Sequence, residues 1–251
     1  MERALTFGSV AEDYERYRPG YPTGLVALLT APAHGQVTRA IEIGAGTGKA
    51  TRVLAAAGIA VSAVEPDPRM LAVLARTCEG LPVEPIPGAF EQVDPAAYGV
   101  FDLLYAAAAW HWTDPVGRWD RTAALVRPGG AVGFVGGPIV LADGALERRE
   151  TELISALLPD GVHPAAPNFG GLDWPGDELL ADDRFDEVTQ DVVRRRSELT
   201  REQYLRHLST VSAYQLLSDA DRTATLSELG AALPDRVMIN ADLVVHRARR
   251  I

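Results

Sequence analysis

The chain has 251 residues, of which 47% are hydrophobic and 23% are charged, enough for one large domain with a sizeable core. Its formal net charge of −10 argues against binding to nucleic-acid backbones, which requires clustered Lys and Arg. A single cysteine, Cys78, excludes an internal disulfide, and the histidines lack metal-site spacing, so no metal is expected. Without an apolar run of about 18 residues or a secretory signal, we expect a cytoplasmic protein that does not associate with membranes.

The N-terminal segment, residues 1–36, is predicted to form a cap. In "YERYRPGYP", residues 14–22, Tyr14 and Arg18 are four residues apart and therefore share one helix face. This arrangement favours a lid that excludes water and binds a carboxylate through the guanidinium group of Arg18. A surface helix packed by its tyrosines is the alternative.

Residues 37–137 are predicted to form the cofactor-binding core. Short β-rich runs alternate here with helical patterns, which is typical of a parallel sheet with crossover helices. Gly58 and Gly80 stand at helix-stop positions, and "RPGG" at 127–130 is predicted to be a turn before the fifth strand. The predicted strands are 38–43, 60–64, 83–86, 100–106 and 131–136, and the predicted helices lie near 48–57, 67–77 and 116–126.

Residues 138–184 are predicted to be an insertion or lid, with a helix near 144–158 before a loop rich in Pro and Gly at 163–176. Residues 185–251 are predicted to form strands at 185–196 and 236–247 around helices at 200–217 and 219–232. We therefore expect one α/β domain, a doubly wound, mostly parallel seven-stranded Rossmann-like sheet with helices on both faces and a helical cap. The basic runs at 194–196 and 247–250 are interpreted as solvated strand ends.

A glycine turn, "IEIGAGTGKAT" at 41–51, joins the first strand to the first core helix. Such a turn lets a ligand approach the backbone at the carboxyl end of a parallel strand. The dinucleotide pattern G-x-G-x-x-G needs a third glycine where Lys49 stands, and the phosphate-loop pattern is absent. Glu42 would repel a pyrophosphate and attract a cation. The turn therefore favours S-adenosylmethionine, which carries a sulfonium and an ammonium group.

A second acid, Glu65 in "AVEPD", ends the second predicted strand. A carboxylate in this place can accept both ribose hydroxyls of a bound nucleoside. Dehydrogenases use the same position, so Glu65 indicates adenosine without saying which adenosine cofactor. A surface acid at a strand end is the alternative.

Four motifs occur in the order and spacing of one family: "EIGAGTG", "VEPD", "FDLLYAAAAWHW" and "RPGG". Together they resemble the class I S-adenosylmethionine-dependent methyltransferases, in the small-molecule branch that resembles trans-aconitate methyltransferases (methyltransferase type 11 domain). The segments "FGSVAEDYERYRPGYP", "TREQY" and "VVHRARR" are also similar to this branch. Nothing between about 138 and 184 matches it.

The resemblance implies roles for particular residues. The methionine part of the cofactor would meet Gly44, Ala45, Gly46, Thr47 and Gly48, with Glu42 near its ammonium group and Tyr14 and Arg18 near its carboxylate. The ribose would be held by Glu65, and the adenine would lie beside Pro66, Met70, Gly88, Ala89, Phe90 and Glu91. Ala106 and Ala107 would pass under the sulfonium. Relatives often have an aspartate at the position of Ala89.

The segment "AWHWTD", residues 109–114, follows the fourth predicted strand. An extended conformation would alternate the sides of Trp110 and Trp112 and leave His111 between them. His111 is either a packed core histidine or a group that faces the pocket and orients or deprotonates the acceptor. It is the first candidate for a general base, and Tyr14 is a more remote one.

Three functions remain open at this point. A methyltransferase acting on a small-molecule acceptor is the first, and the motifs do not identify that acceptor. A catalytically silent protein that binds S-adenosylmethionine in a regulatory role is the second, and a nicotinamide-dependent oxidoreductase is the third. Assembly into a homodimer is left open.

Overall fold

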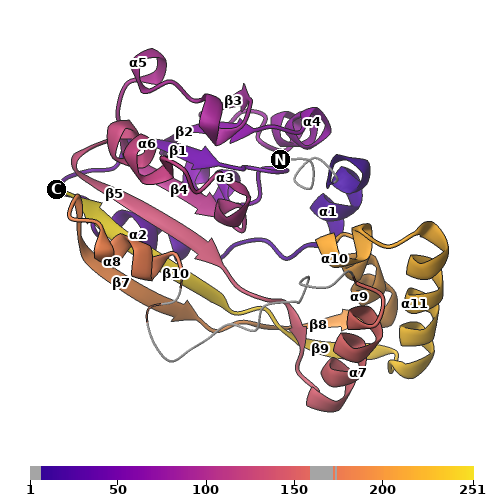
Figure 1. Ribbon diagram of the computed structural model, residues 1–251. Coiled ribbons are helices and arrows are strands. Elements are labelled where there is room, and N and C mark those ends of the chain that lie inside the picture. Colours follow the sequence, from indigo (N-terminus) through magenta and orange to yellow (C-terminus); the bar gives the residue numbers. More distant parts are fainter. Residues whose placement is uncertain (1–6, 159–171, 173) are drawn as a thin grey trace.

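The computed structural model describes residues 7–158, 172 and 174–251. Within them, the largest sheet has seven strands in the order β3-β2-β1-β4-β5-β10-β7 (Figure 1). Its first five strands pair in parallel, and β10 runs antiparallel to both of its neighbours. The predicted fold class is confirmed. The strands are β1 (Arg39–Ile43), β2 (Ala60–Glu65), β3 (Val83–Pro87), β4 (Phe101–Ala107), β5 (Val126–Gly136), β7 (Phe185–Val193) and β10 (Leu243–Arg250).

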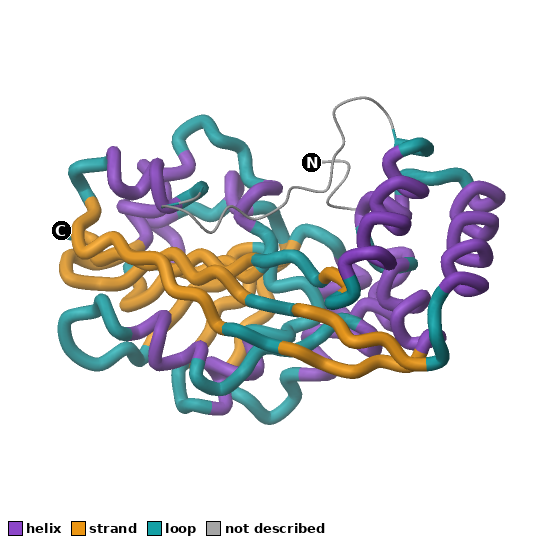
Figure 2. Tube along the Cα trace, turned by 90° about the horizontal axis from the view of Figure 1, so that it is seen from below, coloured by secondary structure: helices purple, strands orange, loops and turns teal. Residues whose placement is uncertain are grey.

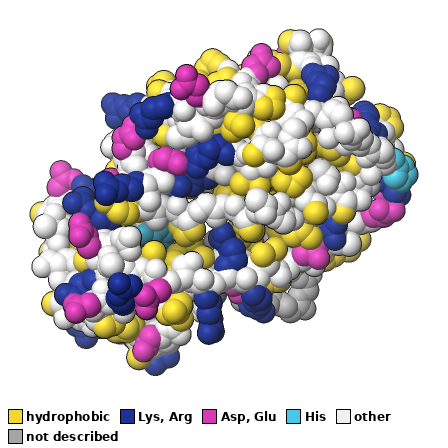
Figure 3. Space-filling model, turned by 180° about the vertical axis from the view of Figure 1, so that it is seen from behind, with side chains coloured by type: hydrophobic (Ala, Val, Ile, Leu, Met, Phe, Trp, Pro, Cys, Tyr) yellow, Lys and Arg dark blue, Asp and Glu magenta, His cyan; other side chains and the backbone are white. Residues whose placement is uncertain are grey.

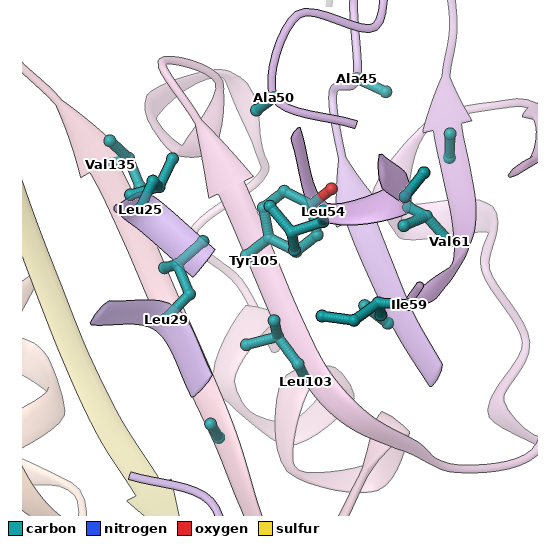
Figure 4. Packing of buried hydrophobic residues seen from close by; sticks show 14 of the residues in the cluster. Leu25, Leu29, Ala45, Ala50, Leu54, Ile59, Val61, Leu103, Tyr105 and Val135 are labelled. Atoms are coloured by element: carbon teal, nitrogen blue, oxygen red, sulfur yellow. The ribbon is translucent and has the colours of Figure 1, made fainter. Parts of the chain in front are cut away.

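Helices cover both faces of the central strands β1 and β4, whose successive side chains point to opposite faces, while the edge strands β3 and β7 are partly exposed. On β4, Tyr105 belongs to the cluster that α2 and α3 cover, whereas Leu104 belongs to the cluster on the other face. Figure 4 shows Leu54 of α3 beside Tyr105 of β4, and Leu25 of α2 beside Val135 of the next strand. The helices packed on the first face are α2 (Leu25–Thr30), α3 (Thr51–Ala56) and α4 (Pro68–Thr77), and those on the second are α6 (Arg118–Leu125) and α8 (Gly176–Ala181).

A second, three-stranded sheet lies beyond the large one and was not predicted. Figure 2 shows strands that continue from the large sheet into it. Four helices cover it and enclose a separate core that contains Ile239 and Tyr204. We call this part the C-terminal subdomain. Its elements are β6 (Val140–Leu141), β8 (Arg196–Thr200), β9 (Arg236–Asn240), α7 (Gly144–Ser155), α9 (Arg201–Leu208), α10 (Ser212–Gln215) and α11 (Asp219–Ala232).

The single strands predicted at 185–196 and 236–247 were wrong in extent. Each is two strands, because the chain leaves one sheet and enters the other at 194–195 and at 241–242. The backbone N–H of Arg195 donates to Asp242 Oδ1 over 2.7 Å, and that of Ala241 donates to the carbonyl of Arg195 over 2.9 Å. These bonds hold the two crossings side by side. The sequence pattern of a β-rich run predicts a strand but does not indicate which of two sheets that strand joins.

Smaller differences follow from local geometry. The predicted helix at 48–57 starts only at Thr51, because the glycine turn occupies the preceding residues, and the predicted helix at 200–217 is interrupted at 209–211. "RPGG" is not a separate turn. It lies within β5 as an irregularity, where Gly129 has a φ of 74° and the register with β4 shifts. Gly58 and Gly80 have positive φ at helix ends, as predicted. Most of the predicted loop at 163–176 lies outside the described residues.

The N-terminal segment supplies two helices, α1 (Ala11–Tyr17) and α2. Helix α1 packs against both α4 of the large sheet and α9 of the C-terminal subdomain. It therefore links the two parts of the molecule near the carboxyl ends of β1 and β2 (Figure 1). The remaining short elements are α5 (Pro95–Tyr98) and the 3₁₀ turns η2 (Phe90–Gln92) and η3 (Trp110–Trp112).

Arg247 and Arg249 of β10 are paired, so the interpretation of the run 247–250 as a solvated strand end was wrong, whereas Arg194 and Arg196 of the other run are exposed. Arg247 Nε lies 2.9 Å from Asp191 Oδ2, and Arg249 Nη2 lies 2.7 Å from Asp186 Oδ2, both across the β10–β7 ladder. The side chains of these arginines are only 18% and 16% exposed. Basic and acidic side chains are mixed over the face shown in Figure 3. Of the helices that the structure describes, none has the length and apolar character needed to cross a membrane.

Candidate active site

A cavity of about 640 Å³ opens at the carboxyl ends of β1, β2 and β4, which is where ligands bind in sheets of this type. We call it the large cavity. A smaller one of about 80 Å³, the small cavity, adjoins it and shares Tyr14, Arg18 and Gly46 with it. The predicted residues that line the large cavity are Tyr14, Arg18, Gly44, Gly46, Glu65, Pro66, Met70, Gly88, Ala89, Phe90, Glu91, Ala107 and His111. Glu42, Ala45 and Thr47 line the small cavity.

Two predicted residues, Gly48 and Ala106, line neither cavity. A Cβ atom on Gly48 would lie 2.9 Å from Cys78 Sγ, so this glycine allows the turn to pack against α4. Gly46 differs, because its φ is 58° and a Cβ atom there would meet no heavy atom within 4 Å. The backbone of Gly46 therefore faces the cavities, and any side chain at this position would project into the space for a ligand.

Glu65 is buried at the end of β2 and is held by the backbone. Its Oε2 accepts from the N–H of Gly46 at 2.8 Å, and its Oε1 accepts from the N–H of Asp67 at 2.9 Å. Burial raises the pKa of this carboxyl, and the two backbone bonds oppose that change. A carboxylate has about four acceptor sites. Both oxygens therefore keep a lone pair that can accept a ligand hydroxyl.

Glu42 lies on β1 below the turn and is 1% exposed. Its Oε2 accepts from Thr51 Oγ1 at 2.6 Å and from the Tyr105 hydroxyl at 2.7 Å. Burial raises the pKa of Glu42 to about 7 despite these two donors. A cation arriving in the small cavity would stabilise the ionised form.

Arg18 was predicted to offer its guanidinium fork to a carboxylate, but most of the fork is already engaged. Its Nε donates to Thr210 Oγ1 at 2.9 Å, and its Nη2 donates to the Thr210 carbonyl at 3.1 Å. The guanidinium carbon lies 5.2 Å from the centre of the Tyr14 ring. Among the described residues no acceptor takes Nη1. Arg18 thus fastens α1 to the segment between α9 and α10 and presents one nitrogen to the cavities.

Glu15 was missed by the sequence analysis, although it joins α1 to the glycine turn. Its Oε2 accepts from Thr47 Oγ1 at 2.7 Å, and its Oε1 lies 2.9 Å from Arg52 Nη2. Lys49 Nζ donates to the Glu15 carbonyl at 2.5 Å and lies 3.6 Å from Oε2. An acidic residue in an exposed-looking helix gives no signal of such contacts, because its partners lie more than 30 residues away.

The predicted extended conformation of the "AWHW" segment was wrong, because Trp110–Trp112 form a 3₁₀ turn. Trp110 is buried, with its ring centre 4.4 Å from that of Phe134, whereas the ring of Trp112 lies 6.0 Å from that of Phe7. His111 lines the large cavity between them. His111 is exposed on one side, but desolvation by the residues packed around it lowers the pKa of the imidazole, so the neutral form, which can accept a proton, prevails at neutral pH.

Several cavity residues carried no signal in the sequence. Phe7, Val211 and Ser212 line the large cavity, and Tyr21 and Arg195 line the small one. They come from the N-terminal segment, from the start of α10 and from the crossing between β7 and β8. In the described part of the chain there is no group of three or more potential metal-binding side chains.

Comparisons with known proteins agree with this geometry. The family described as "Methyltransferase domain" matches residues 41–134, from the glycine turn to β5. An uncharacterized methyltransferase of Mycobacterium tuberculosis (strain ATCC 25618 / H37Rv) is 38% identical over 135 residues, which are 53% of each chain. A methyltransferase-like protein of Schizosaccharomyces pombe is 32% identical over 137 residues, 52% of this chain and 50% of that protein. The chain thus matches about half the length of these relatives.

Solved structures share the fold over most of the chain. A protein of Anaeromyxobacter dehalogenans assigned as a type II methyltransferase aligns with a TM-score of 0.68 at 23% identity, covering 93% of this chain and 98% of that one. The phosphoethanolamine N-methyltransferase 2 of Haemonchus contortus, solved with S-adenosylhomocysteine, aligns with a TM-score of 0.54 at 17% identity, covering 97% and 57%. The family description is general, so the trans-aconitate branch stays a prediction. Residues 41–134 of this chain thus match the methyltransferase domain family, and the rest of the chain resembles methyltransferases in fold.

Proposed function

We propose that this protein transfers a methyl group from S-adenosylmethionine to a small-molecule acceptor. One observation carries the proposal: two buried carboxyls, Glu42 and Glu65, flank a backbone that is open to the cavities at Gly46. An adenosine with cationic groups matches this arrangement, because one acid can accept hydroxyls and the other can face an ammonium. A dinucleotide would place its pyrophosphate against the buried acid Glu42.

In this proposal, different residues of the chain contact different parts of the cofactor. Glu65 accepts the ribose hydroxyls, and Pro66 and Met70 bound the adenine together with the segment 88–91. When bound, S-adenosylmethionine supplies a methyl group that its sulfonium already activates. The protein then has to position the acceptor and exclude water, rather than provide a nucleophile. Phe7, Tyr14 and residues of the C-terminal subdomain line the cavity, and in this proposal they exclude water from it.

The acceptor is proposed to occupy the part of the large cavity bounded by His111, Gly137, Val211 and Ser212. His111 is the proposed general base if the acceptor must lose a proton, and Tyr14 is the more remote candidate. The domain organisation proposed from the sequence follows: residues 1–36 as the cap, 37–137 as the cofactor-binding core, 138–184 as an insertion or lid, and 185–251 as C-terminal strands and helices. The mixed charges of the surface in Figure 3 support a small acceptor over a nucleic acid.

Isothermal titration calorimetry with S-adenosylmethionine and S-adenosylhomocysteine tests this function. We expect both to bind, and Glu65→Ala to weaken binding by roughly 10- to 100-fold, the effect of losing hydrogen bonds to a charged group. Glu84→Ala on β3 is the matched control, because Glu84 is exposed and bonds only to Ser62 among the described residues. Absence of binding of either compound at millimolar concentration would refute the proposal.

Two outcomes would favour the other functions. Tight binding of S-adenosylmethionine without methyl transfer to any member of a broad acceptor panel would indicate a catalytically silent binding protein. Binding of NADH with none of S-adenosylmethionine would indicate an oxidoreductase.

A further inference from the structure

Three residues at the ends of β4 and β5 line both cavities, and they therefore border the place where the cavities meet: Ala107, Ala108 and Gly137. In the proposed function, the adenosine lies beside Glu65 in the large cavity and the ammonium group lies beside Glu42 in the small one. The sulfur of the cofactor joins these two parts of the molecule, so it belongs at this junction. Its third substituent is the methyl group that is transferred.

Of these three residues, Ala108 is the one that offers the junction a side chain. Ala107 packs against the buried cluster that α2 and α3 cover. A Cβ atom on Gly137 would overlap the carbonyl oxygen of Asp242, so that position has no room for a side chain. Ala108 is exposed and belongs to none of the buried clusters of the described chain. Its methyl group therefore faces the open space where the cavities meet.

The backbone of Ala108 is strained, and its neighbours hold it in place. Its φ is 57°, in the left-handed region that residues other than Gly, Asn and Asp rarely adopt. Its N–H donates to the Val135 carbonyl at 2.7 Å. The next residue, Ala109, packs so closely on Gly44 that a Cβ atom on Gly44 would overlap the Ala109 methyl group. Glycine would adopt this φ without strain, so the backbone alone does not explain an alanine at position 108. Strained residues of this kind cluster at active sites, where they contribute to the mechanism.

We infer that the methyl group of Ala108 limits the size of the alkyl group on the sulfonium, so that methyl fits there and larger groups do not. The acceptor is proposed to lie between His111 and Gly137, on the same side of the junction as Ala108. A larger alkyl group on the sulfur would compete with the Ala108 side chain for the space between cofactor and acceptor. Ala108 is thus a specificity-determining residue for the transferred group. The inference rests on the proposed function, because it concerns the same site.

The test compares Ala108→Gly and Ala108→Asn with wild type by calorimetry, in the absence of an acceptor. Both replacements tolerate a left-handed φ, so neither should disturb the fold, but Gly removes the methyl group and Asn enlarges it. The matched control is Glu187→Gly on β7. Glu187 is the other non-glycine residue with a positive φ in the described part of the chain, at 50°, and it lines neither cavity.

Three probes differ in the third substituent on the sulfur. S-adenosylhomocysteine has none, S-adenosylmethionine has a methyl group and S-adenosylethionine has an ethyl group. Wild type should bind the ethyl compound at least about 10-fold more weakly than the methyl compound, because one methylene too many costs that much in a closed site. Ala108→Gly should remove most of this difference. Ala108→Asn should lose at least about 10-fold in affinity for S-adenosylmethionine relative to S-adenosylhomocysteine. Glu187→Gly should match wild type with all three compounds.

The inference is overturned if wild type binds the ethyl and methyl compounds equally, or if Ala108→Gly keeps the wild-type preference for methyl. It is also overturned if Glu187→Gly loses that preference, because relief of backbone strain, and not space in the cavity, would then be the cause. Failure of the proposed function has a different signature, because none of the three compounds would then bind to the wild-type protein.

Discussion

Gly46 and Gly48 lie two residues apart in the turn after β1, yet their surroundings differ. Ala at position 46 must adopt a left-handed φ, which costs about 1 kcal/mol, and its methyl group enters the ligand space. Ala at position 48 meets the same strain and in addition contacts Cys78 Sγ at 2.9 Å and Leu74 Cγ at 3.2 Å. We expect Gly46→Ala to lose cofactor affinity with little loss of stability, and Gly48→Ala to lose roughly 2–3 kcal/mol of stability.

Urea unfolding and calorimetry with S-adenosylhomocysteine, run on both glycine variants, separate these effects. Equal losses of stability in the two variants would show that Gly46 is needed for the fold and not for the ligand.

His111 is the other residue whose role can be isolated. It lines the large cavity and makes no hydrogen bond within the described chain, so His111→Ala should leave the fold and cofactor affinity almost unchanged. If the imidazole accepts a proton from the acceptor, turnover should fall by about 100-fold or more. His111→Asn keeps a polar group without a basic nitrogen and should fail likewise. Steady-state kinetics with an identified acceptor is the measurement that distinguishes these roles. Turnover at the wild-type rate in either variant would show that His111 has a structural role only.

At the scale of elements, Glu15 connects the cap helix α1 to the turn that precedes α3. Glu15→Ala removes the acceptor for Thr47 and the partner of Arg52, so α1 should detach more often from the turn. Because Tyr14 lies on the same helix and Arg18 is the residue directly after its end, affinity for S-adenosylhomocysteine should fall several-fold. Hydrogen exchange of residues 11–17 should become faster.

Glu12→Ala is the matched control for this helix. Glu12 is exposed and pairs with Arg76 on the outer side of α1. If Glu12→Ala and Glu15→Ala accelerate exchange to the same extent, the effect is one of helix propensity and the contact with the turn is irrelevant.

At the scale of the whole molecule, two buried carboxyls predict how stability depends on pH. Burial raises the pKa of Glu42 and of Glu150 from 4.5 to about 7, the first on β1 of the large sheet and the second on α7 of the C-terminal subdomain. The folded protein therefore holds protons that the unfolded chain releases above pH 4.5. This contribution to stability is complete below pH 4.5 and is lost as pH rises through about 7.

Each carboxyl can contribute a slope of up to about 1.4 kcal/mol per pH unit in this window. Urea unfolding at several pH values should therefore show a smaller decline for Glu42→Gln and for Glu150→Gln than for wild type. Glu150→Gln keeps an acceptor for the Tyr204 hydroxyl, which donates to Glu150 Oε2 at 2.5 Å. Glu228→Gln, at an exposed pair with Arg149, is the control. Parallel pH profiles in all four proteins would contradict the assignment.

Much of the large sheet was predictable, because its signals are local. The strand at 60–64, the helix near 67–77 and their glycine stops depend on periodicity and capping within about ten residues. The acids at 42 and 65 were also recognisable, since strand ends in a parallel sheet meet at one edge. The second sheet was not predictable, because β8 and β9 read as continuations of β7 and β10.

The sequence by itself determined the sheet that carries the site, the glycine turn and the two acids beside it. Only the tertiary structure decided what surrounds them: Glu15 on the turn, Arg18 held by Thr210, and Arg195 and Tyr21 at the small cavity. The physical reason is distance along the chain. Arg18 and Thr210 are 192 residues apart, and a contact of that kind leaves no periodic trace in either segment.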